Sequence, residues 1–273
     1  MNTSLDKISI LGAGWLGWPL AKKLVKQGYY VNGATTREAK LDELAQDGIH
    51  PFLIRLTPDG PEAPQLTRFL DTDLLMINIP PGRRDPDVET NFPKKIKSLI
   101  EPTIAAGVTR LLFVSSTGVF SDAQGAVGED TPPKPATASG KALLEVENYL
   151  MEQKTFKTTI LRPGGLFGGE RKAGRFLAGK KDIPNGNAPV NMIHQKDIIG
   201  IIMKIIEQDQ FGKIFHAVAP QHPTREAFYT REAEEQGFDR PAFLENGGDG
   251  PFKIVSSIHL QNTLNYHFKI NLR

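Results

Sequence analysis

The sequence of 273 residues contains no cysteine. This absence excludes a disulfide framework, catalysis by a thiolate, and any zinc or iron–sulfur site with cysteine ligands. It also fits a protein of a reducing compartment. The six histidines show no HxH or HExxH spacing. We therefore expect no metal site.

Long uncharged runs and an excess of one charge are also missing. The longest uncharged stretch near the N-terminus, residues 8–21, covers 14 residues, whereas a membrane span needs about 18. The start, MNTSLDK, lacks the basic and apolar regions of a signal peptide. With 33 Lys+Arg against 31 Asp+Glu, the net charge is +2 and no basic stripe stands out. We expect a cytoplasmic protein that binds neither membrane nor nucleic acid.

Short apolar runs alternate with helical patterns along the first part of the chain. The runs predict strands at residues 8–11, 29–34, 52–56, 74–79, 111–115 and 158–161. Helices are predicted at residues 16–27, 38–46, 91–106 and 137–153. Continuously apolar strands that alternate with helices indicate a parallel sheet covered on both faces. Right-handed crossovers then give a doubly wound α/β fold.

The pattern changes after about residue 163. Glycine and proline become frequent up to residue 189, and the tail holds a glycine-rich loop at 245–252. Between them, one helix at 198–207, whose apolar face is core, and one strand at 213–218 stand out. We expect residues 1–163 to form the doubly wound domain and residues 164–273 to form mainly a smaller α+β lobe, interleaved with the sheet.

A GxGxxG motif, formed by Gly12, Gly14 and Gly17, lies between the first strand and the first helix. The first glycine permits a tight turn, the second lets the backbone approach a pyrophosphate, and the third lets helix and strand pack closely. The helix start, with Trp15 and Leu16, then offers amides to the phosphates. The motif predicts a dinucleotide cofactor; the alternative is a tight turn without a ligand.

The end of the second strand bears on the choice of nucleotide. An acidic residue there would bind the ribose 2′-hydroxyl of NAD, but this chain has Thr35, followed by Thr36 and Arg37. Two hydroxyls and a guanidinium suit a 2′-phosphate. We therefore favour NADP over NAD. NAD stays open because Glu38 could reach a 2′-hydroxyl, and both threonines could instead cap the next helix.

Three later segments carry a family resemblance. LLFVSSTGVF at 111–120 resembles "VSSxxVYG", LRPGGLFG at 161–168 resembles "LRPxxVYGP", and IHQKDI at 193–198 resembles "VHVxD". These are segments of extended short-chain dehydrogenases/reductases. The chain resembles the NAD-dependent epimerase/dehydratase family, in its atypical bacterial subgroup that uses GxGxxG and lacks the usual catalytic Tyr. The resemblance implies a Rossmann sheet of seven strands with a small C-terminal lobe. Residues 1–163 would then be the Rossmann domain that binds NAD(P), and residues 164–273 mainly the substrate-binding lobe.

The resemblance also implies a set of site residues. The family's Ser corresponds to Ser116, and the Lys of its YxxxK motif corresponds to Lys141, which would hold the nicotinamide ribose. Thr137 stands at the Tyr position, and a threonine has no accessible phenolate that a lysine could tune. Ser116, Thr137 and Lys141 are thus the candidate catalytic residues. Further cofactor contacts are implied at Pro80, Ser115 and Pro163.

Several assignments at this site have alternatives. Lys141 could act as a general acid, pair with Glu145, or be a solvated lysine. Ser139 could supply the missing hydroxyl, and Tyr229 could reach in from the substrate lobe. Ser116 could make only a local turn bond.

Basic and polar residues of the predicted loops suggest a ligand class. Two groups of basic residues suit an anionic substrate, such as a nucleotide-sugar diphosphate or a carboxylate. The first group is Arg83 and Arg84, and the second is Arg171, Lys172 and Arg175. Solvated loops are the equal alternative. We expect Asp197 to be the N-cap of the helix at 198–207 and His194 to brace that turn. Trp15 and Trp18 are expected to be packing or lid residues.

The function predicted is an oxidoreductase-like protein of the epimerase/dehydratase type. It would pass a hydride to or from nicotinamide C4 on an anionic, nucleotide-sugar-like small molecule. The alternative is a non-catalytic NAD(P)-binding sensor or scaffold, since fold does not imply function. A β-hydroxyacid dehydrogenase is disfavoured by the strand at 213–218. A homodimer is left open.

Overall fold

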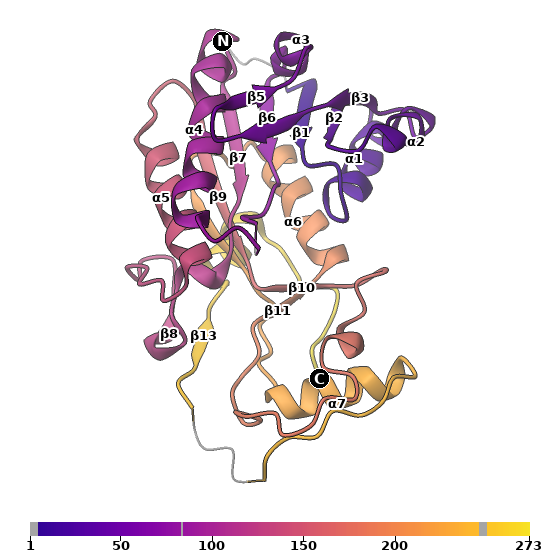
Figure 1. Ribbon diagram of the computed structural model, residues 1–273, viewed down its shortest axis with the longest axis vertical. Helices are drawn as coiled ribbons and strands as arrows, with labels where there is room; N and C mark the ends of the chain where they lie inside the picture. Colours follow the sequence, from indigo (N-terminus) through magenta and orange to yellow (C-terminus); the bar gives the residue numbers. More distant parts are fainter. Residues whose placement is uncertain (1–4, 83, 246–249) are drawn as a thin grey trace. The chain divides into compact units, whose positions relative to one another are not determined.

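The computed structural model describes residues 5–82, 84–245 and 250–273. Its central sheet has seven strands in the order β12-β9-β7-β6-β1-β2-β3 (Figure 1). These strands are β1 (Lys7–Leu11), β2 (Tyr30–Thr35), β3 (His50–Leu53), β6 (Leu74–Ile77), β7 (Arg110–Val114), β9 (Lys157–Pro163) and β12 (Ile214–Ala217). The pairs from β3 to β9 are parallel. The predicted Rossmann architecture is confirmed.

Helices connect the strands. They are α1 (Gly17–Lys26), α2 (Leu41–Gln46), α3 (Leu66–Leu70), α4 (Val88–Ala105), α5 (Ala138–Glu152), α6 (Gln195–Glu207), α7 (Arg225–Glu235) and α8 (Ile258–Leu264). Short 3-10 turns are η1 (Glu38–Lys40), η2 (Thr117–Val119), η3 (Asp122–Gln124) and η4 (Ala173–Phe176). Helices α4 and α5 lie side by side, and α1 packs on β1 and β2. Leu16, Leu20 and Leu24 are buried, as their spacing predicts.

Short strands form three two-stranded sheets outside the central one. β4 (Arg55–Thr57) pairs with β5 (Gly60–Glu62), β8 (Gly125–Val127) with β13 (Lys253–Val255), and β10 (Gly165–Phe167) with β11 (Met192–His194). The prediction of one strand over 52–56 is therefore wrong. The chain leaves the central sheet at Ile54 and turns back through a hairpin, in which the Thr57 hydroxyl donates to the Gly60 carbonyl.

Two predicted helices differ at their starts. The helix predicted from residue 91 begins at Val88, which puts Pro93 beyond the first turn. The Asp85 carboxylate accepts bonds from the Asp87 amide and the Asn91 side chain and so orders this start. The helix predicted from Glu38 opens as the 3-10 turn η1, and α2 follows from Leu41.

The chain divides into two compact units. Unit 1 comprises residues up to Val119, Pro135–Leu161 and Met203–Ile214; unit 2 comprises Phe120–Lys134, Arg162–Ile202 and Phe215–Arg273. An apolar cluster in unit 2 is built around Phe167, Met192 and Phe228. The functional division predicted at residue 163 stays a prediction.

Asp197 of unit 2 is not the N-cap that we expected. α6 begins at Gln195, so Asp197 lies in its first turn, and His194 takes the capping position by accepting a bond from the Lys196 amide at 3.0 Å. The Asp197 side chain is 1% exposed and binds the chain's last residues instead. It accepts bonds from the Tyr266 hydroxyl and from the amides of Lys269 and Ile270.

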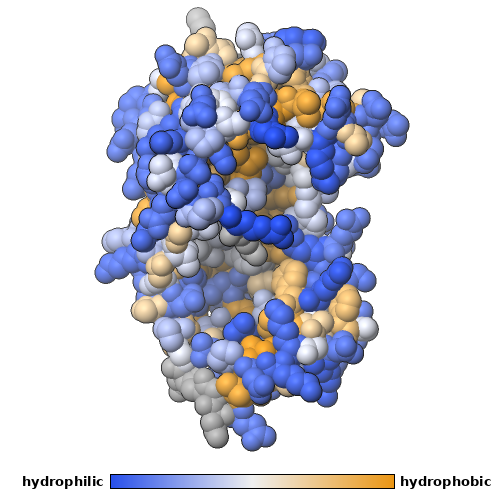
Figure 2. Space-filling view, in the orientation of Figure 1, coloured by the Kyte–Doolittle hydropathy of each residue, from blue (hydrophilic) through white to orange (hydrophobic). Residues whose placement is uncertain are grey.

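Hydrophilic residues cover most of the face shown in Figure 2. Among the described residues, no helix is long and apolar enough to cross a membrane. The expectations for residues 1–4 of the N-terminus, for Arg83 and for residues 246–249 of the glycine-rich loop lie outside the described residues.

Candidate functional site

The glycine-rich segment links the carboxyl end of β1 to α1, and two of its glycines are required by packing. Gly12 has a φ of +106°, and a Cβ added to it would lie 2.5 Å from the Asn78 carbonyl oxygen. A Cβ on Gly17 would overlap the Gly12 carbonyl oxygen. Neither position has room for a side chain, because strand, turn and helix touch there.

Gly14 is different. A Cβ added to it would meet no other atom of the described residues within 4 Å, and its φ lies outside the range that favours glycine. The Gly14 amide closes the turn on the Gly12 carbonyl at 2.8 Å. Packing of the chain does not explain this glycine, whereas close approach of a pyrophosphate would. The loop therefore fits a dinucleotide, with Trp15, Leu16 and Gly17 at the helix start.

The end of β2 presents the residues predicted to select the nucleotide. Thr35 is 8% exposed, and its hydroxyl accepts a bond from the Arg37 amide. Thr36 and Arg37 are exposed. Arg37 directly precedes η1 and makes no capping bond with its side chain. Both exposed side chains are thus placed where a ligand could reach them.

Trp18 packs against side chains of its own unit. Its Nε1 donates to Asp47 at 2.7 Å, and the Lys40 ammonium lies 4.6 Å from its ring centroid. Lys22 pairs with the same Asp47 carboxylate. Hydrogen bonding to Lys22 and Trp18 lowers the pKa of Asp47, so this carboxylate stays ionised. The cluster ties α1 to the end of α2.

The turn that follows Ser116 packs closely against the helix start that follows Thr137. Ser116 follows β7, and its Oγ accepts a bond from the Gly118 amide at 3.0 Å. A Cβ on Gly140 would overlap the Gly118 carbonyl oxygen, so α5 starts directly against η2. Thr137 is the N-cap of α5, and its Oγ1 accepts a bond from the Gly140 amide. The local turn bond considered for Ser116 is thus present.

Lys141 lies one helical turn after Thr137 and is half exposed. Its amide donates to the Thr137 carbonyl, and its Nζ lies 3.3 Å from the Glu89 carboxylate. Glu145 pairs with Lys97 of α4 at 2.7 Å. The alternative in which Lys141 pairs with Glu145 is therefore wrong: the neighbouring helix α4 supplies the partners of both residues.

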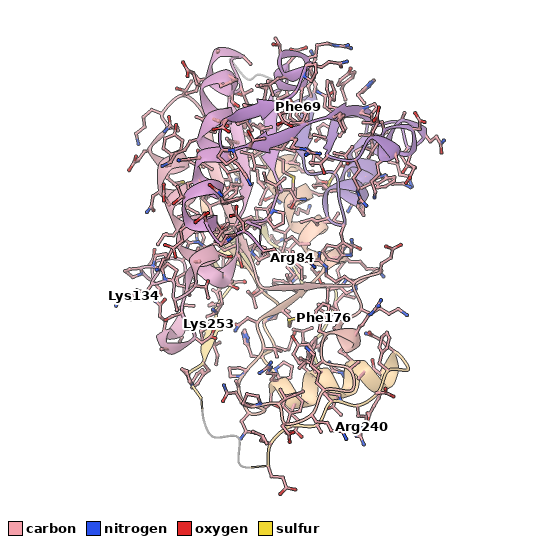
Figure 3. The ribbon with its side chains drawn as sticks, in the orientation of Figure 1. Phe69, Arg84, Lys134, Phe176, Arg240 and Lys253 are labelled. Carbon is pink, nitrogen blue, oxygen red and sulfur yellow. The ribbon has the colours of Figure 1, made fainter. Side chains whose placement is uncertain are left out.

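The other predicted contacts have varied surroundings. The Ser115 hydroxyl donates to Glu147, which is 2% exposed, so this side chain is held inside unit 1. Pro80 and Arg84 are exposed, and Figure 3 shows the Arg84 side chain. Pro163 is buried at the end of β9, in unit 2. Asn78 and Glu89 did not stand out in the sequence. A polar residue directly after the apolar run 74–77 is the signal that could have indicated Asn78.

Unit 2 holds the remaining candidates. Arg171, Lys172 and Arg175 are exposed, and the Lys172 ammonium lies 5.9 Å from the Phe238 ring centroid. Burial raises the pKa of Tyr229, whose hydroxyl lies 3.9 Å from the Met192 sulfur. Burial also lowers the pKa of His194 and lowers that of His216 to about 4. Both histidines are therefore neutral at pH 7.

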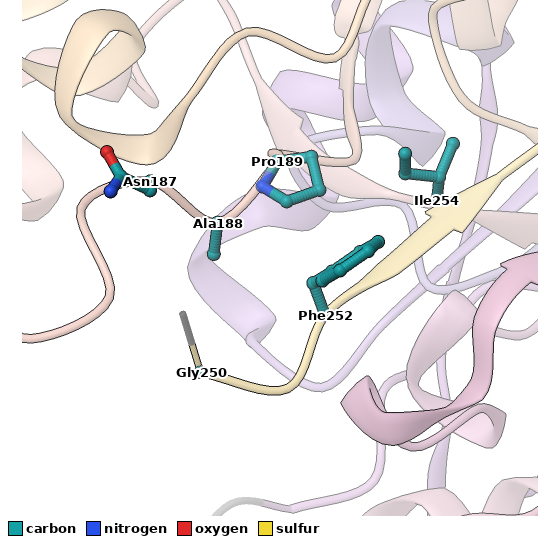
Figure 4. Close-up of a pocket in the computed structure, with 6 residues that line it drawn as sticks. All are labelled: Asn187, Ala188, Pro189, Gly250, Phe252 and Ile254. Atoms are coloured by element: carbon teal, nitrogen blue, oxygen red, sulfur yellow. The ribbon is translucent and has the colours of Figure 1, made fainter. Parts of the chain in front are cut away.

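A mainly apolar pocket also lies in unit 2 (Figure 4). Its lining consists of Asn187, Ala188, Pro189, Gly250, Phe252 and Ile254. In the part of the chain that the structure describes, no group of three or more His, Asp or Glu side chains is placed to hold a metal ion.

The capping role of Thr137 gives a first prediction. Thr137→Ala removes the bond to the Gly140 amide, so we expect a loss of about 1 kcal/mol in unfolding free energy. Thr137→Ser keeps the hydroxyl and should stay within about 0.5 kcal/mol of the wild type. Urea unfolding of the three proteins measures both changes. Equal stability of the alanine variant and the wild type would contradict the capping role.

Comparisons with known proteins agree with this geometry. A family model described as NAD(P)H-binding matches residues 12–209. Protein YeeZ of Escherichia coli K12 is 35% identical over 266 residues, which cover 97% of this chain and 96% of YeeZ.

Two solved structures share the fold. A putative NAD-dependent epimerase/dehydratase from Methylobacillus flagellatus has a TM-score of 0.75 at 26% identity, covering 97% of this chain and 94% of that one. MoeE5 in complex with UDP-glucose and NAD has a TM-score of 0.76 at 19% identity, covering 98% and 94%. This chain belongs to the NAD(P)H-binding family and has the fold of the epimerase/dehydratase proteins.

Proposed function

We propose that this protein is an NAD(P)-dependent enzyme of the epimerase/dehydratase type, acting on an anionic small molecule that carries a hydroxyl or carbonyl group. One observation carries the proposal. Ser116 follows the carboxyl end of β7, the start of α5 with Thr137 and Lys141 packs against the turn after Ser116, and the glycine-rich loop follows β1, two strands away in the same sheet. In open α/β sheets, this edge is where ligands bind.

The three side chains have complementary chemistry. Ser116 would hydrogen-bond the reacting oxygen of the substrate, and the Lys141 ammonium would hold the ribose hydroxyls. When bound, the nicotinamide supplies or accepts the hydride at C4. Thr137 accepts a bond from Gly140, and its own hydroxyl proton can be donated. Because threonine has no accessible anion, Thr137 would pass a proton on only while receiving another, as a relay.

Lys141 must change partners for this role. In the structure its ammonium faces Glu89, and both side chains are about half exposed. Such exposed ion pairs contribute only about 0–1 kcal/mol to the free energy of unfolding. The pair is therefore weak enough for the ammonium to turn to a ribose.

The substrate class and the cofactor choice rest on charge and on the solved relative. MoeE5 is described with UDP-glucose and NAD, and a nucleotide sugar is the class we propose here. Exposed cations suit a diphosphate, and each unit has some of its own: Arg84 in unit 1, and Arg171, Lys172 and Arg175 in unit 2. Thr36 and Arg37 at the end of β2 favour NADP over NAD.

A double variant tests the enzyme proposal. The protein is incubated with NAD⁺ or NADP⁺ and a panel of nucleotide sugars, and reduced nicotinamide and altered sugars are measured by absorbance and chromatography. Ser116→Ala combined with Lys141→Met should lower turnover by a factor of about 100 or more. Lys97→Met is the matched control, because this lysine belongs to the neighbouring ion pair of the same two helices.

The outcomes separate two functions. Unchanged turnover in the double variant would contradict the assigned residues. Tight cofactor binding without turnover on any sugar would favour a non-catalytic sensor, which the use of Thr137 as a helix cap supports.

A further inference from the structure

The peptide between Gly12 and Ala13 is held on both sides. Its carbonyl oxygen accepts bonds from the Gly14 amide at 2.8 Å and from Asn78 Nδ2 at 3.1 Å. Its N–H, on Ala13, donates to the Ala34 carbonyl of β2 at 2.8 Å. The orientation of this peptide sets the direction of the turn that follows, where the amides of the glycine-rich loop begin.

Asn78 contacts the loop with both its backbone and its side chain. It follows β6 directly, and its amide extends the parallel pairing by donating to the Leu11 carbonyl at 2.9 Å. Its own carbonyl oxygen fills the space that a Cβ on Gly12 would need. The side-chain amide then reaches across to the Gly12 carbonyl. The backbone and the side chain of Asn78, at the end of β6, therefore form a clamp on Gly12, meaning that both contact this first glycine of the loop.

We propose that Asn78 is a positioning residue for the cofactor: its amide fixes the Gly12 carbonyl, so that the amides after it face the pyrophosphate. This inference rests on the proposed use of the loop for NAD(P). The position needs a neutral donor. A carboxylate of the same shape could not donate to a carbonyl, and it would add a negative charge beside the phosphates.

Two substitutions distinguish positioning from simple bracing of the sheet. Asn78→Ala removes the clamp, and we expect NADPH and NADH to bind about 10-fold more weakly, which corresponds to one hydrogen bond. Asn78→Asp should bind both nucleotides about 100-fold more weakly than the wild type at low salt. Because this extra loss is a charge repulsion, the gap between the two variants should shrink as NaCl is raised.

The experiment is fluorescence titration of the whole protein with NADPH and NADH at several NaCl concentrations, together with urea unfolding of each variant without cofactor. Asn91→Ala is the matched control, because its side-chain amide bonds the Asp85 carboxylate in the same unit. It should bind the cofactor within twofold of the wild type.

Each result has one meaning. Wild-type affinity in both Asn78 variants overturns the inference. Equal losses of affinity in Asn78→Ala and Asn78→Asp at every salt concentration also overturn it, because they indicate a purely structural role. The same holds if Asn91→Ala loses as much affinity as Asn78→Ala. If the wild type binds neither nucleotide, it is the proposed function that fails.

Discussion

Gly14→Ala is expected to weaken NADPH and NADH binding by about 10- to 100-fold, the equivalent of the 1–3 kcal/mol that overpacking costs. The stability of the protein without cofactor should not fall. Alanine at position 14 meets no atom of the described residues, so its methyl group would contact only a bound pyrophosphate. Reduced freedom of the unfolded chain could even raise stability by about 0.4–1 kcal/mol.

Gly17→Ala provides the contrast. Its methyl group would overlap the Gly12 carbonyl oxygen, which is backbone and cannot rotate away. We expect this variant to lose about 1–3 kcal/mol of unfolding free energy in the absence of any cofactor. Urea unfolding and nicotinamide fluorescence, measured on the same preparations, separate the two effects. A Gly14→Ala protein that binds both nucleotides like the wild type would contradict the assignment of this loop.

Asp197→Ala is expected to lower the unfolding free energy by about 3 kcal/mol or more, since each unpaired buried donor costs about 1–3 kcal/mol. The carboxylate accepts bonds from the Tyr266 hydroxyl at 3.0 Å and from the amides of Lys269 and Ile270 at 2.7 and 3.1 Å. Burial and the Asp197 carboxylate raise the pKa of Tyr266, so its hydroxyl remains a donor at neutral pH.

Two variants control this measurement by urea unfolding. Tyr266→Phe removes one of the three donors and should cost about 1 kcal/mol. Asp239→Ala changes an exposed aspartate of the same unit, and its unfolding free energy should stay within about 0.5 kcal/mol of the wild-type value. An Asp197→Ala protein as stable as the Asp239 variant would show that Asp197 does not anchor the C-terminal residues.

Local patterns predicted the central sheet well, because its strands are buried on both faces. The runs at 74–77 and 111–114 contain only apolar side chains, and such strands stand out from their amphipathic neighbours. The leucine spacing of α1 marks its buried face in the same way. The hairpin of β4 and β5 was missed because two strands of three residues carry too few side chains to show a period of two.

At the candidate site, the contacts that could not be predicted from the sequence are mainly those between residues far apart along the chain. A carboxylate four residues from Lys141 on the same helix, Glu145, was a reasonable local partner, but Glu89 lies 52 residues away. Asp197 had the composition of a helix cap, yet the C-terminal residues that it binds lie about 70 positions further along. Helix packing and chain-end docking decide these contacts, and neither leaves a local pattern.

We propose that the glycine-rich loop and the end of β2 bind a nicotinamide dinucleotide, with NADP preferred. Titration of the purified protein with NADPH and with NADH, followed by nicotinamide fluorescence and thermal shift, tests it most directly. We predict that both bind and that NADPH binds more tightly, through Thr35, Thr36 and Arg37. Tighter binding of NADH would overturn the preference and point to Glu38. Binding of neither nucleotide would contradict the claim itself.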